Sequence, residues 1–188
     1  MSSPRAFALS IFALLFLPAS AMAQSTGGAE YVPPPAADMS VAGSKAKLLP
    51  DGTAAAPADA PRAVKKAIWA ANRIQDKPYK YGGGHAEIED NGYDCSGTVS
   101  YALIGAGLLD SPLPSGPFMR WGARGKGSWI TVYTNPGHAF AVIAGLRLDT
   151  STGGITSRKI ARTAERGPRW RVALRKTRGF KKRHPVGF

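Results

Sequence analysis

Two helices are predicted from the spacing of apolar residues in the body of the chain. The first begins near Pro61, because proline is tolerated in a first helical turn, with Asp59 as a nearby capping candidate and Lys77-Pro78 as the end. The apolar residues of its predicted buried face recur at helical spacing and are Val64, Ala67, Ile68, Ala71 and Ile74. A second helix is predicted to begin at Cys95 and to stop at Gly107, with Val99, Ala102, Leu103 and Ala106 inside.

The pattern changes to strands after an irregular, Pro- and Gly-rich stretch over residues 108–126. Residues 129–133 are β-branched and aromatic, and a turn at Asn135-Pro136-Gly137 follows. Residues 139–144 are apolar without alternation, which is typical of a strand covered on both faces. Gly145 is expected to turn the chain, so that residues 146–150 return beside it.

The two ends of the chain differ from this body in composition. Residues 1–23 have the layout of a secretory signal peptide: Arg5, a short apolar stretch, and Ala21-Met22-Ala23 as a cleavage site. Residues 24–60 are rich in Ala, Pro, Gly and Ser and are interpreted as a linker. Residues 61–157 then form the folded core. Residues 158–188 form a basic C-terminal extension, with one further strand suggested by the alternation of Trp170, Val172 and Leu174.

Composition narrows the possible functions. The chain has 188 residues, a net charge of +13 and a single cysteine. That cysteine count excludes an internal disulfide framework and any multi-cysteine zinc site, and nothing in the sequence indicates a metal or an organic cofactor. The positive charge favours an anionic partner. Because the chain is expected to be exported, envelope polymers suit this charge better than nucleic acid, which is not expected as a partner.

Cys95 is the candidate nucleophile. A thiol attacks as its thiolate, and the macrodipole and free N–H groups at a helix N-terminus stabilise that anion. Ser96 and Gly97 are small enough to let a substrate carbonyl approach, and the N–H groups of residues 95–97 are candidates for binding an oxyanion. The alternative is a buried structural cysteine.

His138 is the candidate base, because it opens the predicted core strand and is held rigidly there. If Ala144 and Gly145 form a two-residue turn, paired residues have numbers that sum to 289, and Asp149 lies diagonally from His138 on the same face. Asp149 is then the group that orients the imidazole. A bulge in the turn would favour Thr150 instead. His184 is expected at the surface. For His85 the surface is favoured, and a place lining the cleft is the alternative.

These segments together resemble a known family. An aromatic-Gly-Gly segment at residues 79–83, then Tyr93-Asp94-Cys95-Ser96-Gly97 and a later Gly137-His138 are similar to the NlpC-type cell-wall peptidases, which are papain-like cysteine endopeptidases of peptidoglycan. The resemblance covers residues 61–150. It implies an α+β fold in which a helix carrying the cysteine packs on an antiparallel sheet carrying the histidine.

The resemblance also implies an activity: hydrolysis of peptidoglycan stem peptides at the bond between D-γ-glutamate and the diamino acid. Cys95 would be the nucleophile, His138 the base and Asp149 the third polar residue, although the family more often has His, Asn or Gln there. Tyr79 matches a substrate-placing tyrosine, and Asp94 and Ser96 beside the nucleophile are further substrate-binding candidates.

Other functions remain open on the sequence. A catalytically silent wall-binding module would keep the fold and use the basic extension as an anchor, and an amidase or acyltransferase would use the same thiol. In each case we expect a monomer without a transmembrane segment after export, located in the periplasm, secreted, or associated with the cell wall, and in contact with peptidoglycan and other anionic envelope polymers.

Overall fold

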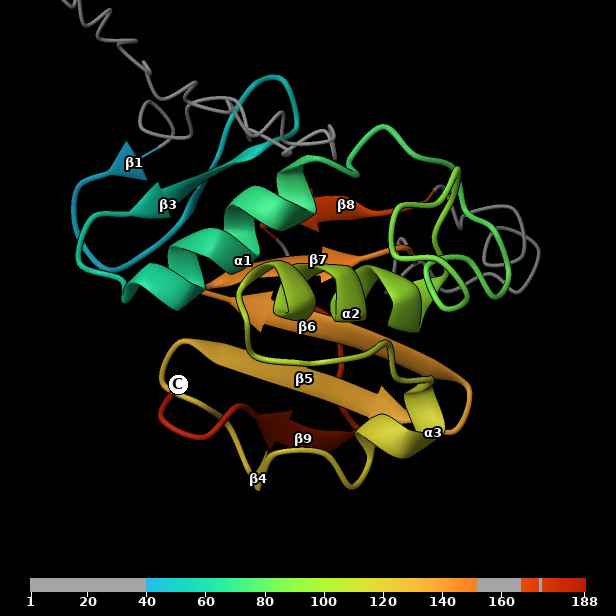
Figure 1. Ribbon diagram of the computed structural model, residues 1–188. Helices are drawn as coiled ribbons and strands as arrows, with labels where there is room; N and C mark the ends of the chain where they lie inside the picture. The colour runs from blue at the N-terminus through green and yellow to red at the C-terminus, as the bar shows by residue number, and fades with distance from the viewer. Residues whose placement is uncertain (1–39, 152–166, 173) are drawn as a thin grey trace, which may run out of the picture. The chain divides into compact units, whose positions relative to one another are not determined.

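Helices cover one face of a six-stranded sheet. The computed structural model describes residues 40–151, 167–172 and 174–188. Helices α1 (Arg62–Asn72) and α2 (Cys95–Gly105) lie side by side across the sheet (Figure 1). A short third helix, α3, spans Ser115–Phe118. The predicted α+β class is confirmed, and helix α2 begins at the predicted residue.

The main sheet is antiparallel throughout, with the strand order β4-β9-β5-β6-β7-β8. Its strands are β4 (Ala123–Arg124), β5 (Ile130–Asn135), β6 (His138–Ile143), β7 (Leu146–Asp149), β8 (Arg169–Arg171) and β9 (Lys181–His184). Helix α3 and strand β4 lie in the stretch 108–126, for which the sequence predicted only irregular structure.

The register between β6 and β7 is the one predicted from a two-residue turn. Ala141 pairs with Leu148, Val142 with Arg147, and Ile143 with Leu146, so each pair of numbers sums to 289. Ala144 and Gly145 both have positive φ, 46° and 93°, as the favoured tight hairpin turn requires. No bulge shifts Asp149 to the other face, and Thr150 is therefore not the partner of His138.

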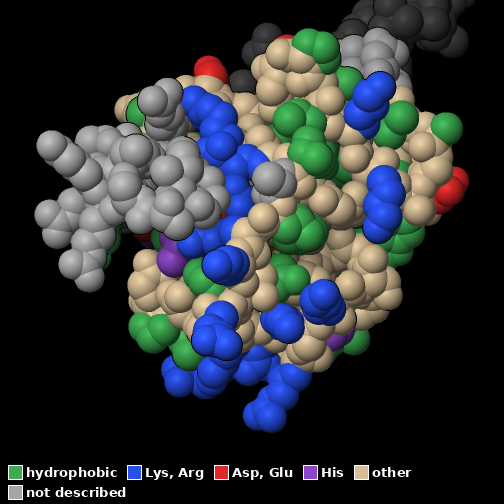
Figure 2. Space-filling view, turned by 180° about the vertical axis from the view of Figure 1, so that it is seen from behind, with side chains coloured by type: hydrophobic (Ala, Val, Ile, Leu, Met, Phe, Trp, Pro, Cys, Tyr) green, Lys and Arg blue, Asp and Glu red, His purple; other side chains and the backbone are tan. Residues whose placement is uncertain are grey.

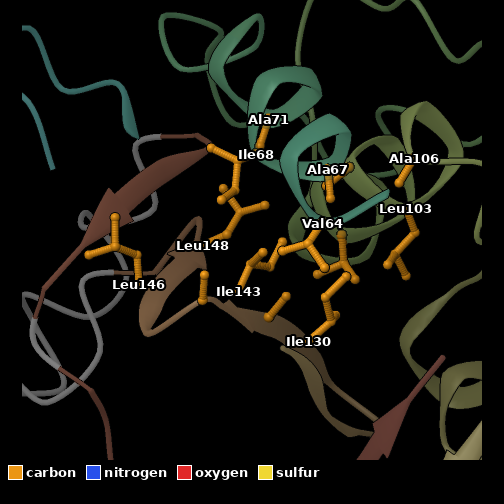
Figure 3. Close-up of a cluster of buried hydrophobic side chains, with 14 of the residues drawn as sticks. Val64, Ala67, Ile68, Ala71, Leu103, Ala106, Ile130, Ile143, Leu146 and Leu148 are labelled. Carbon is orange, nitrogen blue, oxygen red and sulfur yellow. The ribbon is translucent and has the colours of Figure 1, made fainter. Parts of the chain in front are cut away.

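The hydrophobic core fills the space between the two helices and the sheet (Figure 3). Val64 and Ile68 of α1 and Leu103 of α2 are fully buried there against Ile143 and Leu148. Helix α2 contacts α1 closely, because a side-chain carbon at Gly105 would overlap Ala70. Since side chains alternate along a strand, His138, Phe140 and Val142 of β6 occupy the face of the sheet that the helices do not cover.

Helix α1 ends earlier than its apolar pattern predicts. It stops at Asn72 rather than Lys77, and residues 73–76 form turns. The side chain of Gln75 donates to Ala71 O at 2.9 Å, and its Oε1 accepts from Trp170 N at 2.9 Å. Asp59 does not cap the helix: Pro61 occupies the N-cap position, without a capping side chain.

Part of the predicted linker is folded. Residues 40–60 contain β1 (Ser40–Val41), β2 (Lys47–Leu48) and β3 (Ala54–Pro57), which form a small sheet with β3 in the centre. The Asn72 side chain holds this sheet on α1 by accepting from Ala54 N and donating to Ala54 O, both at 2.9 Å. Alanines give little apolar periodicity, which is why this segment resembles a linker in the sequence although Ala54 and Ala56 are fully buried.

The predicted signal peptide, residues 1–23, and the linker up to residue 39 lie outside the described residues. Within the described ranges, no helix is long and apolar enough to cross a membrane.

The C-terminal extension is part of the main sheet. Strand β8 is the further strand suggested by the sequence, and its Trp170 donates to Asn72 Oδ1 at 2.8 Å, but Val172 and Leu174 beyond it are exposed. Strand β9 was not predicted. It pairs with both β4 and β5, and its buried Arg183 donates to Met119 O. The boundary predicted at residue 157 therefore divides a single sheet.

Because β9 lies between two strands, we expect its removal to destabilise the protein. Deleting residues 179–188 breaks the ladders to β4 and β5 and lowers the free energy of unfolding by at least about 3 kcal/mol, from several lost hydrogen bonds of about 1 kcal/mol each. Urea unfolding followed by circular dichroism measures this. Val186→Ser, at an 80% exposed position, is the control. A truncated chain as stable as this control would show that β9 is not structural.

Candidate active site

Cys95 is the first residue of α2, where the helix N-terminus is closed by Asp94. The Asp94 backbone is extended, and its Oδ1 accepts from Gly97 N at 2.7 Å, as an N-cap does. The backbone carbonyl of Asp94 accepts from the Thr98 hydroxyl at 2.7 Å. These contacts fix the backbone at the first turn of α2 and so the direction in which the Cys95 side chain projects. Its side chain is a free thiol and is partly exposed.

The glycine-rich segment at residues 82–84 packs directly on this first helical turn. A side-chain carbon at Gly97 would overlap the carbonyl oxygen of Gly83, so only glycine fits there. Gly82 N also donates to Asp94 Oδ2 at 3.1 Å. The two sequence segments that carry the family resemblance are therefore in contact, and their glycines are required by the closeness of the two backbones.

His138 opens β6 directly after the turn at Asn135-Pro136-Gly137. Asn135 Oδ1 accepts from Gly137 N at 2.9 Å and stabilises this turn. Helix α3 holds the turn from outside, because the Ser115 hydroxyl donates to Pro136 O at 3.1 Å and Ser115 O accepts from the buried Thr134 hydroxyl at 2.5 Å. The turn before His138 and its pairing with Asn135 therefore hold the His138 backbone in place. Of its side chain, 14% is exposed.

Asp149 is the buried partner of His138. Its Oδ1 lies 2.9 Å from His138 Nε2 and also accepts from Ser151 N at 2.9 Å. Its Oδ2 accepts from Arg175 Nη1 at 3.1 Å, and Arg147 Nε lies 3.5 Å away. The carboxylate side chain itself has no exposed surface. These partners supply the compensation that a buried charge needs.

The site holds His138 in its charged form. Burial lowers the pKa of His138, but hydrogen bonds to Asp149 and to Cys95, with the negative charges of both, outweigh it and raise that pKa to about 9. Burial raises the pKa of Asp149, but the hydrogen bond and charge of His138, together with Ser151 N and Arg175, hold it below its usual value. The structure therefore places His138 beside both its hydrogen-bonded partner Asp149 and the Cys95 thiol, which also raises the pKa of the imidazole.

Backbone N–H groups suited to an oxyanion are found at the start of α2. The first N–H groups of a helix have no partner within the helix. Gly97 N already donates to the Asp94 side chain, so it is no longer one of the three N–H groups that were predicted to bind an oxyanion. Cys95 N and Ser96 N remain as the candidate donors beside the sulfur.

The other predicted site residues lie around α2. Tyr79 is half-buried, and its backbone forms a bridge with Tyr93, two residues before the thiol. Asp94 and Ser96 are buried and face each other, with the Ser96 hydroxyl donating to Asp94 Oδ1 at 3.1 Å, so they build the helix start and have little surface for a substrate.

His85 was expected at the surface, and this is wrong. Its Nε2 lies 3.1 Å from both Asp94 Oδ1 and Ser96 Oγ, and only 20% of its side chain is exposed. The ring thereby joins the glycine-rich segment to the start of α2.

Arg175 is a site residue that the sequence analysis missed. Besides its bond to Asp149, its guanidinium lies over the rings of Phe140 and Phe180, 5.2 Å and 5.3 Å from their centres. It comes from the basic extension, where twelve Lys and Arg residues look alike in the sequence. Its position four residues after Arg171, the end of β8, is the only signal in the sequence that sets it near β7.

Comparisons with known proteins give likenesses in structure alone. No protein-family model and no curated protein matches the chain. Among solved structures, the peptidoglycan hydrolase RipB from Mycobacterium tuberculosis matches at a TM-score of 0.47 and 22% identity, over 69% of this chain and 70% of that one. The P60 domain of antigen MAP1204 from M. avium subspecies paratuberculosis matches at 0.44 and 19%, over 64% and 93%. Since both TM-scores are below 0.5, function is inferred from the site itself.

The raised pKa of His138 makes stability depend on pH. The imidazolium has a pKa of about 9 in the folded chain against 6.5 in a free side chain, so its contribution is complete below about pH 6.5 and is lost as the pH rises through about 9. We expect the free energy of unfolding to fall by on the order of 2–3 kcal/mol over this range, relative to His138→Gln. Urea unfolding at several pH values measures both proteins. Parallel curves for the two would contradict the assignment.

Proposed function

We propose that the chain is an exported cysteine endopeptidase that hydrolyses peptidoglycan stem peptides, at the bond between D-γ-glutamate and the diamino acid. The observation that carries this proposal is the arrangement of Cys95, His138 and Asp149, with the thiol at a helix N-terminus and the imidazole held by a buried carboxylate. The proposed substrate is inferred from the sequence resemblance to the NlpC-type peptidases, and the proposed export from the predicted signal peptide.

Each residue then has a defined step. The Cys95 thiolate attacks the glutamyl carbonyl carbon, and the resulting oxyanion is bound by Cys95 N and Ser96 N. His138 donates its proton to the leaving amine nitrogen as the C–N bond breaks, which leaves a thioester on Cys95. The neutral imidazole next takes a proton from water, and the hydroxide attacks the thioester carbonyl and expels the Cys95 thiolate. The carboxylic acid that is released loses its proton to solvent, so the thiolate and imidazolium are regenerated.

Asp149 acts through His138 in this scheme. Its hydrogen bond to Nε2 leaves the other ring nitrogen for Cys95, and its charge favours the imidazolium that donates the proton. The family more often has His, Asn or Gln at this position, but the Asp149 carboxylate can likewise accept a hydrogen bond from the imidazole N–H. Arg175 and Arg147 compensate its buried charge.

Digestion of defined stem peptides tests the proposal. We expect the wild type to release two fragments whose combined mass exceeds that of the substrate by one water, and Cys95→Ala to release none. His138→Gln should lower kcat/KM by roughly 10²–10⁴-fold, the usual contribution of a general acid–base group. His184→Gln, which changes the last residue of β9, whose ring lies against Gly125 O rather than against Asp149, is the matched control and should retain activity.

The masses also separate the other functions. Fragments that carry an added amine acceptor indicate an acyltransferase, and loss of ammonia with the chain intact indicates an amidase. Undiminished cleavage by Cys95→Ala would exclude the thiol mechanism. Binding of stem peptides without any cleavage would instead identify a silent wall-binding module.

A further inference from the structure

The face of the sheet opposite the helices carries a basic groove next to the candidate active site. A cavity of about 210 Å³ is lined on this face by Tyr133, Phe140 and Val142, with Lys126, Arg175 and Lys182 around them. A second cavity of about 440 Å³ continues from Lys182 along β9 and β4. We call the two together the basic groove, and its cations are Arg124, Lys126, Arg175, Lys181, Lys182 and the mostly buried Arg183.

Among the described residues, carboxylates neutralise little of the charge of this groove. None of the described residues that line either cavity is an Asp or Glu. Over the described ranges, the carboxylate ion pairs involve Lys80, His85, His138, Arg147 and Arg175, so Arg175 is the one groove cation that has such a partner. Figure 2, which views the molecule from the side away from the helices, shows Lys and Arg side chains gathered over this face.

A chain of contacts links the basic groove to His138. Lys182 is paired with Tyr133 across β9 and β5, and therefore shares the helix-free face with it. Tyr133 stacks on Phe140 with ring centres 4.8 Å apart, and Phe140 lies 6.3 Å from the His138 ring. Arg175 belongs both to the groove and to the partners of Asp149. The groove thus begins beside the site and extends along β9.

We propose that the basic groove binds an extended anionic polymer and so holds the enzyme on its substrate. Two adjoining open cavities, with cations spread over β4, β9 and the segments beside them, suit a chain with repeated negative groups better than one small anion. Binding that depends on several exposed charges is weakened by salt. The polymer's source outside the cell rests on the proposed function, but the binding itself does not require Cys95.

Fluorescence anisotropy with labelled polymers tests this proposal on the full chain. The probes are poly-L-glutamate, which carries carboxylates, polyphosphate, and neutral dextran. The groove variant is Lys126→Gln with Lys182→Gln. The matched control is Arg62→Gln with Lys66→Gln, which removes the same charge from exposed positions of α1 on the opposite face. Thermal unfolding checks that both variants fold.

We expect the wild type and the control to bind the charged polymers but not dextran. The groove variant should bind on the order of tenfold more weakly at low salt, and its affinity should depend less steeply on salt, as the loss of two cation contacts predicts. Lys182→Glu should weaken binding further. Binding of only one charged polymer supports the proposal and identifies the anion, whether carboxylate or phosphate.

Two results would overturn the proposal. One is an equal loss of affinity in the groove variant and the control, which would show that net charge alone attracts the polymer. The other is no binding of either polyanion by the wild type. The binding experiment measures no turnover, so its outcome is separate from that of stem-peptide cleavage. A chain that cleaves stem peptides but does not bind polyanions disproves only the proposed polymer binding. A chain that binds polyanions but does not cleave disproves only the proposed peptidase activity.

Discussion

The tight turn at Ala144–Gly145 is the constraint on which the candidate site depends. Because this turn has two residues, β7 returns in a register that puts Asp149 on the same face as His138. One additional residue would move the carboxylate to the helix-covered face, into the core with Leu148. Asp149 therefore needs no unusual backbone conformation to reach His138, because it is an ordinary strand residue of β7. The site requires only regular strand alternation and a turn of fixed length.

A second set of contacts fixes the thiol relative to this hairpin. The N-cap at Asp94 and the glycine-rich segment set the start of α2, while the core beneath it holds the helix on the sheet. The nucleophile thus comes from the helix layer and the histidine and aspartate from the sheet. Packing of the two layers is what brings them together, so the chemistry of the site depends directly on the stability of the core.

Much of this arrangement could be predicted from the sequence, because it depends on local rules. The start of α2 follows from Asp94 and the small residues after it, and the β6–β7 register follows from the turn length. Three features were not predictable in this way. Buried alanines give no periodicity, so β3 resembled a linker. The four residues of β9 are all basic or histidine and show no apolar alternation. Arg175 contacts Asp149 across 26 residues, a pairing that requires the position of β8.

The central claim is an imidazolium held between Asp149 and Cys95, and NMR titration of the His138 ring tests it most directly. The chain has three histidines, so His138→Gln assigns the signal. We predict that the pKa of His138 is about 9 in the wild type and falls toward 6.5 in Asp149→Asn, with a smaller decrease in Cys95→Ala. A midpoint near 6.5 in the wild type, unchanged by either substitution, would contradict the account.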